Sequence, residues 1–70
     1  MRKNRITIFC NEFYILEAII VYLNNKKIIK NILEINDKFD YPYCIIDSRI
    51  KNKEIDKILK SKFYNNYKLR

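Results

Sequence analysis

The 70-residue sequence has no glycine, no histidine and no tryptophan, and it contains a single proline and two cysteines. Without histidine, Cys10 and Cys44 do not make up a zinc site by themselves, so no metal is expected. The lack of glycine removes the loops that cradle phosphate, and no serine-based nucleophile elbow is present. Catalytic hydrolysis therefore has no support in the sequence, and no cofactor is expected.

The length of the chain predicts one domain over residues 1–70, close to the lower limit of what folds alone. Ordering such a chain costs roughly 1.5 kcal/mol per residue, which the burial of apolar side chains about cancels. No disulfide framework or metal is visible to add stability. A protein partner or a homo-oligomer is therefore expected.

No stretch predicts a membrane span, because the longest apolar run, residues 15–23, is short and is interrupted by Glu17. The charged residues at the start are followed by too few apolar residues for a secretory signal. We expect a cytoplasmic protein, or one in the host cytoplasm if the source is viral, with reduced thiols.

Isoleucine, lysine and asparagine supply nearly half of the residues, which indicates a very AT-rich genome such as that of a phage, a large virus, an organelle or a low-GC bacterium. The net charge of +7 and the pI near 9.5 are typical of proteins that bind nucleic acid or an anionic surface. Most of this charge is lysine, which an AT-rich genome over-supplies, and only four of the fifteen basic residues are arginine. The charge alone is therefore a weak indicator of nucleic-acid binding.

The hydrophobic pattern predicts a small α/β fold, with α+β as the alternative class. The first predicted strand has apolar residues on both faces, as in a central strand that is covered on two sides. The predicted elements are a strand over 5–10, a helix over 12–23, strands over 28–35, 43–47 and 49–51, a helix over 53–64 and a frayed tail over 65–70.

Residues 28–35 are ambiguous. Ile28, Ile29, Ile32 and Leu33 have helical spacing, whereas the β-branched content favours a strand, which we predict to run parallel to the first strand through a right-handed crossover. In the preceding turn the asparagines are predicted to take the left-handed conformation that glycine usually supplies.

The helix over 12–23 is apolar on almost every side, and only Glu12 and Glu17 interrupt it. A helix of this kind is either deeply buried or presents a second face to a partner. This pattern favours protein binding.

The stretch from Tyr41 to Asp47 resembles the cis-proline strand of the thioredoxin-like superfamily in its small glutaredoxin form. Residues 6–9 and 48–54 are similar to the family's first strand and to the segment that leads into its last helix. The resemblance implies the order β-α-β-β-β-α, a mixed sheet and the loss of the second helix. It also implies a cis Pro42 that contacts substrate, with Tyr41, Pro42 and Tyr43 as a binding surface. The alternative is that Pro42 simply opens a strand.

The resemblance does not extend to the family's redox residues. Cys10 is followed by Asn11, Glu12 and Phe13, so the Cys-x-x-Cys dithiol is absent, and there is no glycine pair to let glutathione approach the backbone. Cys10 is a candidate lone nucleophile, or a small apolar side chain at the end of a core strand. Cys44 is predicted to be core. The resemblance places both cysteines on neighbouring strands, so a disulfide switch is a further alternative.

The leading hypothesis is a small thioredoxin-like protein without oxidoreductase chemistry that binds another protein or itself. One alternative is a single-thiol, glutathione-dependent oxidoreductase that uses Cys10. The other is a nucleic-acid-associated protein that uses the basic C-terminal region, where aromatic and basic residues alternate as they do on nucleic-acid surfaces. The basic residues of that region are Lys57, Lys60, Lys62, Lys68 and Arg70.

Overall fold

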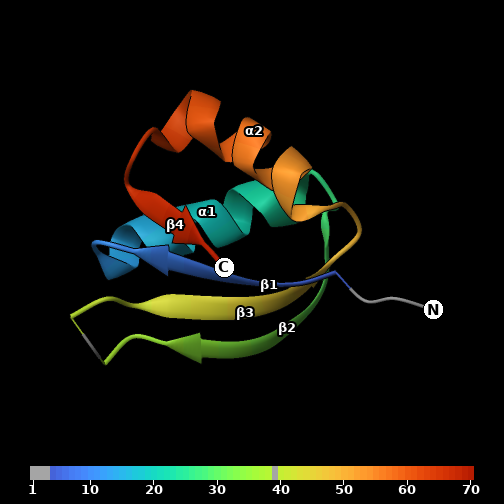
Figure 1. Cartoon of the computed structure of the whole chain (residues 1–70). Helices are drawn as coiled ribbons and strands as arrows, with labels where there is room; N and C mark the ends of the chain where they lie inside the picture. The colour runs from blue at the N-terminus through green and yellow to red at the C-terminus, as the bar shows by residue number, and fades with distance from the viewer. Residues whose placement is uncertain (1–3, 39) are drawn as a thin grey trace.

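Four strands and two helices alternate along the chain in a computed structural model that describes residues 4–38 and 40–70. No helix among these residues is long and apolar enough to cross a membrane. The elements are β1 (Asn4–Cys10), α1 (Phe13–Asn25), β2 (Ile29–Asn36), β3 (Tyr43–Ser48), α2 (Asn52–Phe63) and β4 (Tyr67–Leu69) (Figure 1).

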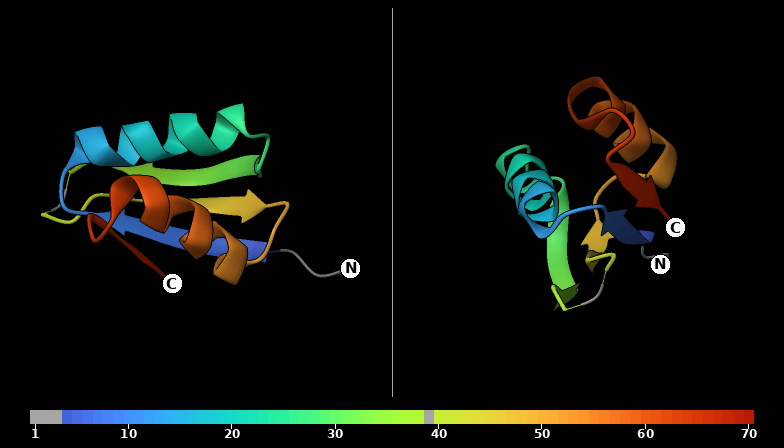
Figure 2. Two further views of the ribbon diagram at one scale, coloured as in Figure 1. Left: turned by 90° about the horizontal axis from the view of Figure 1, so that it is seen from above. Right: turned by 90° about the vertical axis from the view of Figure 1, so that its left-hand side faces the viewer.

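The strands form one sheet in the order β2-β3-β1-β4, and every neighbouring pair is antiparallel. Strands β1 and β2 run in the same direction, but β3 lies between them, which is the split β-α-β, or ferredoxin-like, topology. Both helices cover the same face of the sheet, α1 on the β2 side and α2 on the β4 side (Figure 2). The protein is therefore a two-layer mixed α/β structure with one sheet face left uncovered.

The element order implied by the thioredoxin-like resemblance is not confirmed, and neither is the mixed sheet. Residues 49–51 do not form a strand, because the Ser48 hydroxyl closes a tight turn that leads directly into α2. In this turn Ser48 Oγ donates to the Ile50 carbonyl at 2.7 Å and accepts the Ile50 N–H at 3.0 Å. The C-terminal residues that were predicted to fray instead contain β4, which pairs with β1.

Residues 29–36 form a strand, and their register explains the helical spacing of the apolar residues. The pairing of β2 with β3 shifts twice, between Ile29 and Asn31 and between Ile32 and Glu34. Each shift is a β-bulge that adds one residue on β2 and so resets which face the following side chains occupy. Every third residue, Ile29, Ile32 and Ile35, consequently lies on the helix side of the sheet, and the spacing resembles that of a helix.

The core lies between the two helices and the face of the sheet that they cover. Alternate residues of β1 and β3 point into it and are almost completely buried, and both cysteines are among them. The buried apolar residues are Ile6, Ile8, Cys10, Leu16, Ile19, Leu23, Ile28, Ile29, Cys44, Ile46, Ile55, Leu59 and Tyr67.

Among residues 4–38 and 40–70, two residues adopt positive φ values. Lys27 (φ 60°) ends the turn after α1, and Tyr64 (φ 54°) ends α2. Both stand at helix C-termini, where glycine is usual because it has no Cβ to clash. The prediction that asparagines would take this conformation after the first helix is wrong, because Lys27 takes it.

Candidate nucleic-acid interface

The sheet face that the helices leave uncovered, here called the open face, carries the alternate side chains of the strands. Residues directly opposite each other in an antiparallel pair share a face, so the register identifies its members. The open face is formed on the three strands β1, β3 and β4 by Arg5, Thr7, Phe9, Tyr43, Ile45, Asp47 and Lys68, and Arg70 extends it beyond β4.

Two aromatic side chains lie next to each other on the open face, at one end of the two central strands. Phe9 of β1 is directly opposite Tyr43 of β3, their ring centroids are 5.5 Å apart, and the ring planes are inclined by 51°. The Tyr43 hydroxyl donates a 2.7 Å hydrogen bond to Glu34 Oε2 on β2, which fixes the orientation of its ring. Both side chains are only half-buried, so the pair presents aromatic surface to solvent.

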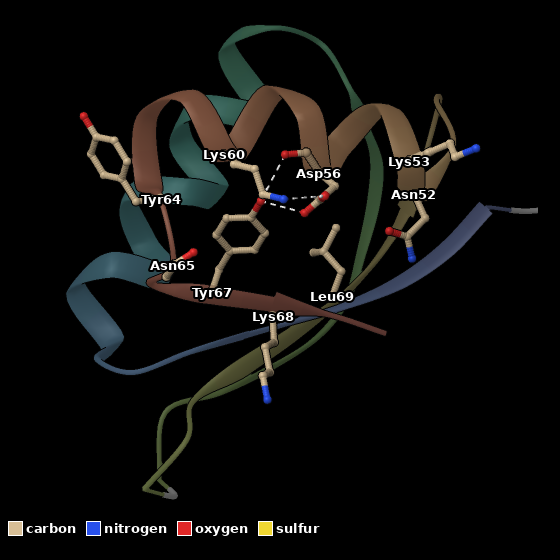
Figure 3. A pocket seen from close by; sticks show the side chains of 9 residues that line it. All are labelled: Asn52, Lys53, Asp56, Lys60, Tyr64, Asn65, Tyr67, Lys68 and Leu69. Carbon is tan, nitrogen blue, oxygen red and sulfur yellow. Dashed lines mark hydrogen bonds and ion pairs between the residues drawn. The ribbon is translucent and has the colours of Figure 1, made fainter.

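Positive charge lies beside this aromatic pair, along β4. Lys68 is opposite Phe9, and Arg70 is held next to β1 by two backbone hydrogen bonds with Thr7, of 2.9 and 3.0 Å. The Lys68 side chain extends away from α2 (Figure 3). Within residues 4–38 and 40–70 the ion pairs are Arg5–Asp47 and Lys60–Asp56. The side chains of Lys68 and Arg70 therefore have no carboxylate partner in the described chain.

At the other end of β1 the charges compensate each other. Arg5 Nε lies 3.7 Å from Asp47 Oδ1, and the Asp47 side chain is buried although that oxygen accepts no hydrogen bond. A buried carboxylate without hydrogen bonds depends on a nearby cation, so Arg5 is engaged with Asp47. The uncompensated positive charge of the open face is consequently concentrated on the β4 side.

A pocket of about 270 Å³ continues the open face at the end of β1. It lies where the β1–α1 turn, the segment before β3 and the α2–β4 turn meet, and it combines aromatic rings, two carboxamides and one ammonium group without a carboxylate. Such a lining suits a flat, polar group attached to an anion. The lining residues are Phe9, Cys10, Asn11, Tyr41, Asn65, Tyr67 and Lys68.

Tyr67 holds β4, and with it Lys68, in position. Its ring is buried under α2, and its hydroxyl lies 2.7 Å from Asp56 Oδ1 and 3.0 Å from the Asp56 carbonyl oxygen, both of which accept (Figure 3). Burial, the hydrogen bond to Asp56 and the charge of that carboxylate raise the pKa of Tyr67. Beside this contact α2 and β4 enclose a groove of about 590 Å³, which Lys53 and Lys60 line.

The structure separates the basic residues that the sequence grouped together. Lys57, Lys60 and Lys62 are on α2, on the other side of the molecule from the open face. Lys60 Nζ pairs with Asp56 Oδ2 at 3.6 Å, and Lys62 Nζ lies 4.7 Å from the centroid of the Tyr22 ring. Only Lys68 and Arg70 of the predicted basic set reach the open face.

The predicted binding residues around the proline are also separated. Pro42 is buried and its carbonyl accepts the Cys10 N–H at 2.9 Å, which joins the start of β3 to the end of β1. The residues that the structure describes contain no cis peptide bond, so Pro42 is a trans strand opener. Tyr43 lies on the open face, and the exposed Tyr41 lines the neighbouring pocket.

Both cysteines are free thiols in the apolar core. Desolvation by burial raises the pKa of Cys10 to about 12. Burial, and second the proximity of Cys10, raise the pKa of Cys44 to about 12. At neutral pH both thiols are therefore protonated, and the environment of Cys10 is that of a packing residue rather than of an activated nucleophile.

The expected neighbouring arrangement of the two cysteine-bearing strands is observed, since β1 and β3 are antiparallel partners. Cys44 is opposite Ile8, so Cys10 is its diagonal neighbour on the same face. Diagonal neighbours are about 7–8 Å apart, beyond the usual separation of bridged cysteines. A disulfide between them would require the backbone to move.

Sequence reasoning missed Phe9 as a functional candidate because the first strand was expected to be covered on both faces. The signal that could have found it is alternation. Phe9 and Tyr43 each lie next to a cysteine that points into the core, so they occupy the opposite face of adjacent strands.

Among the described residues there is no group of three or more metal-ligating side chains close enough together to hold a metal ion. Comparison with known proteins gave no match to a family model, to a curated protein or to a solved structure. The functional argument therefore depends on the geometry of the open face.

Proposed function

We propose that this protein binds single-stranded nucleic acid on the open face of its sheet. The observation that carries the proposal is the Phe9–Tyr43 pair on the two central strands, uncovered by helices and flanked by Lys68 and Arg70. A four-stranded sheet whose central aromatic side chains stack on bases is an established way of recognising single strands.

In this proposal each component of the open face has a separate role. The rings of Phe9 and Tyr43 stack on exposed bases, and each such stack contributes about 1–3 kcal/mol. Lys68 and Arg70 run along β4 beside the rings and neutralise phosphates of the same strand. The pocket at the end of β1, with Asn11, Tyr41 and Asn65, lies where a base beyond the aromatic pair would be placed.

The arrangement favours the open face over α2, where the sequence placed the nucleic-acid site. On α2, Lys60 and Lys62 are already engaged with Asp56 and with the Tyr22 ring. The proposal includes no redox step, because both thiols are buried and protonated.

Fluorescence anisotropy with labelled single strands of about 12 nucleotides, RNA and DNA, tests the proposal. We expect binding whose dissociation constant Kd rises steeply with salt, and weaker binding of the matching duplex. Phe9→Ala and Tyr43→Ala should each raise Kd roughly 5- to 150-fold, which corresponds to the loss of one base stack. Lys68→Ala should reduce the slope of log Kd against log salt by about 0.7.

The controls are an exposed aromatic and an exposed cation away from the open face. Tyr14→Ala on α1 and Lys57→Ala on α2 should leave Kd within about twofold. Absence of binding at low salt would refute the proposal. If Lys57→Ala weakened binding as much as Lys68→Ala, the interaction would be a general effect of net charge and the open face would not be the site.

A further inference from the structure

The strand at the edge of the sheet away from β4 exposes three neighbouring large apolar side chains. On β2, Ile32 and Leu33 are each 44% exposed and Ile35 is 48% exposed. The strand has eight residues, whereas the opposite edge strand, β4, has three. Long edge strands with exposed apolar side chains are sites of association with another chain.

The two β-bulges restrict the kind of association that this edge allows. A bulge interrupts the regular alternation of backbone groups, so β2 offers no continuous ladder to an added strand. Bulged edges are one way in which proteins prevent open-ended sheet growth. The remaining way to cover Ile32, Leu33 and Ile35 is side-chain packing in a closed assembly.

The charges on β2 are self-complementary. Lys30 and Glu34 are both exposed, and each lies two residues from Ile32, on opposite sides of it. If two copies of β2 are related by a two-fold axis beside Ile32, the two strands are antiparallel. Lys30 of each copy then lies near Glu34 of the other. Such an interface uses the same surface on both subunits, as closed dimers do.

We propose that the protein forms a closed homodimer through β2, with the side chains of Ile32, Leu33 and Ile35 packed against those of a second copy and with reciprocal Lys30–Glu34 ion pairs. The interface lies at the opposite edge of the sheet from β4, so it leaves Lys68 and Arg70 uncovered. The dimer does not require nucleic-acid binding, although Glu34 belongs to both arguments because its carboxylate also accepts the Tyr43 hydroxyl hydrogen bond.

Sedimentation equilibrium on the full chain, over a range of protein concentrations, tests the dimer. The wild type should show a monomer–dimer equilibrium with no larger species. Lys30→Glu places two carboxylates opposite each other at both ends of the interface, and Glu34→Lys does the same with two ammonium groups. Each variant alone should therefore raise the dimer Kd roughly tenfold or more.

Mixing the two variants provides the decisive measurement. In the heterodimer of Lys30→Glu with Glu34→Lys, one contact is the wild-type Lys30–Glu34 ion pair and the other is an ion pair with its two charges exchanged. No like charges face each other, so the mixture should dimerise about as tightly as the wild type. Lys57→Glu, the same charge change on an exposed residue of α2, is the matched control and should leave the dimer Kd within about twofold.

Three outcomes would overturn the proposal: a monomeric wild type at all concentrations, equal effects of Lys30→Glu and Lys57→Glu, or a mixture that dimerises no better than either variant alone. Circular dichroism on each variant separates a loss of association from a loss of folding, because β2 substitutions at exposed positions should retain the spectrum of the wild type.

Discussion

The two faces of the sheet are built from the same strands and have opposite chemistry. On the side of the helices β1 contributes Ile6, Ile8 and Cys10, which are at most 2% exposed. On the open face the intervening residues of the same strand are Thr7 and Phe9, which are half-buried. The first face holds the fold together, whereas the second has side chains that a ligand can reach.

This difference shows where stability and function are separable. Substitutions on the covered face leave a cavity that the packed layer cannot fill, so they should act on folding. Substitutions on the open face should act on binding and have smaller effects on folding. The following predictions test that division, beginning with the largest expected effect.

Two adjacent isoleucines of β3 provide a matched pair. Ile46 is fully buried on the covered face, and Ile45 is half-buried on the open face. Ile46→Ala should lower the free energy of unfolding by about 2–5 kcal/mol, and Ile45→Ala by less than half of that. Urea unfolding followed by circular dichroism measures both, and equal losses would show that the open face is covered by something in solution.

The buried thiols should be unreactive in the folded protein. Because burial raises the pKa of Cys10 and of Cys44 to about 12, neither is a thiolate at neutral pH. Reaction with an aromatic disulfide reagent at pH 8 should be slow and should accelerate many-fold in urea. A fast phase from Cys10 in native buffer, absent in Cys10→Ser, would contradict this and would support the single-thiol alternative.

The same burial predicts how stability depends on alkaline pH. A thiol in the unfolded chain loses its proton near pH 9.0, whereas the folded chain keeps these protons until about pH 12. Between these values the folded state binds more protons, so the free energy of unfolding falls as the pH rises. In a Cys10→Ala, Cys44→Ala variant the fall measured by urea titration should be shallower. An unchanged slope would assign the effect to other groups.

The hydrogen bonds between Tyr67 of β4 and Asp56 of α2 should make a smaller contribution to the free energy of unfolding. Tyr67→Phe keeps the buried ring but removes the hydroxyl that donates to Asp56, so it should cost about 1 kcal/mol of unfolding free energy. Chemical denaturation measures it, with Tyr64→Phe as the control, because the Tyr64 side chain is exposed in the turn between α2 and β4. Equal costs would show that the hydrogen bond contributes nothing.

Tyr64 lies on neither face of the sheet. Its replacement should have the smallest effect on the free energy of unfolding, and should raise it rather than lower it. Its backbone has φ 54° and ψ −120°, a combination that is costly for any residue with a Cβ. Tyr64→Gly should therefore stabilise the protein by about 0.5–1 kcal/mol without changing nucleic-acid binding. A loss of binding in this variant would show that the Tyr64 ring takes part in the site.

Much of the local structure was predictable, and the topology was not. The strand-forming residues of 5–10 and 43–47 predicted two strands, and the hydrophobic pattern over 53–64 predicted α2. The three-residue strand β4 carries almost no local pattern, since its place depends on Tyr67 reaching the core below Asp56. Strand order likewise depends on contacts between distant segments, which no short window of sequence contains.

The site was predictable in part for the same reason. Tyr43 and Lys68 were singled out for separate reasons, one beside the proline and the other in a basic tail. They belong to one surface only because β1 lies between β3 and β4 and brings Phe9 next to both. Charge density alone favoured α2, because the sequence does not show that its lysines face away from the aromatic pair.

The two bulges of β2 also determine where the chain can change length. In β1, which has a regular register, the loss of one residue would invert every later side chain between the covered and the open face. Loss of Leu33 from β2 would instead convert a bulge into a regular pair and leave Ile32 and Ile35 on their present face. The edge strand β2 can therefore tolerate the deletion of one residue, whereas the central strand β1 cannot.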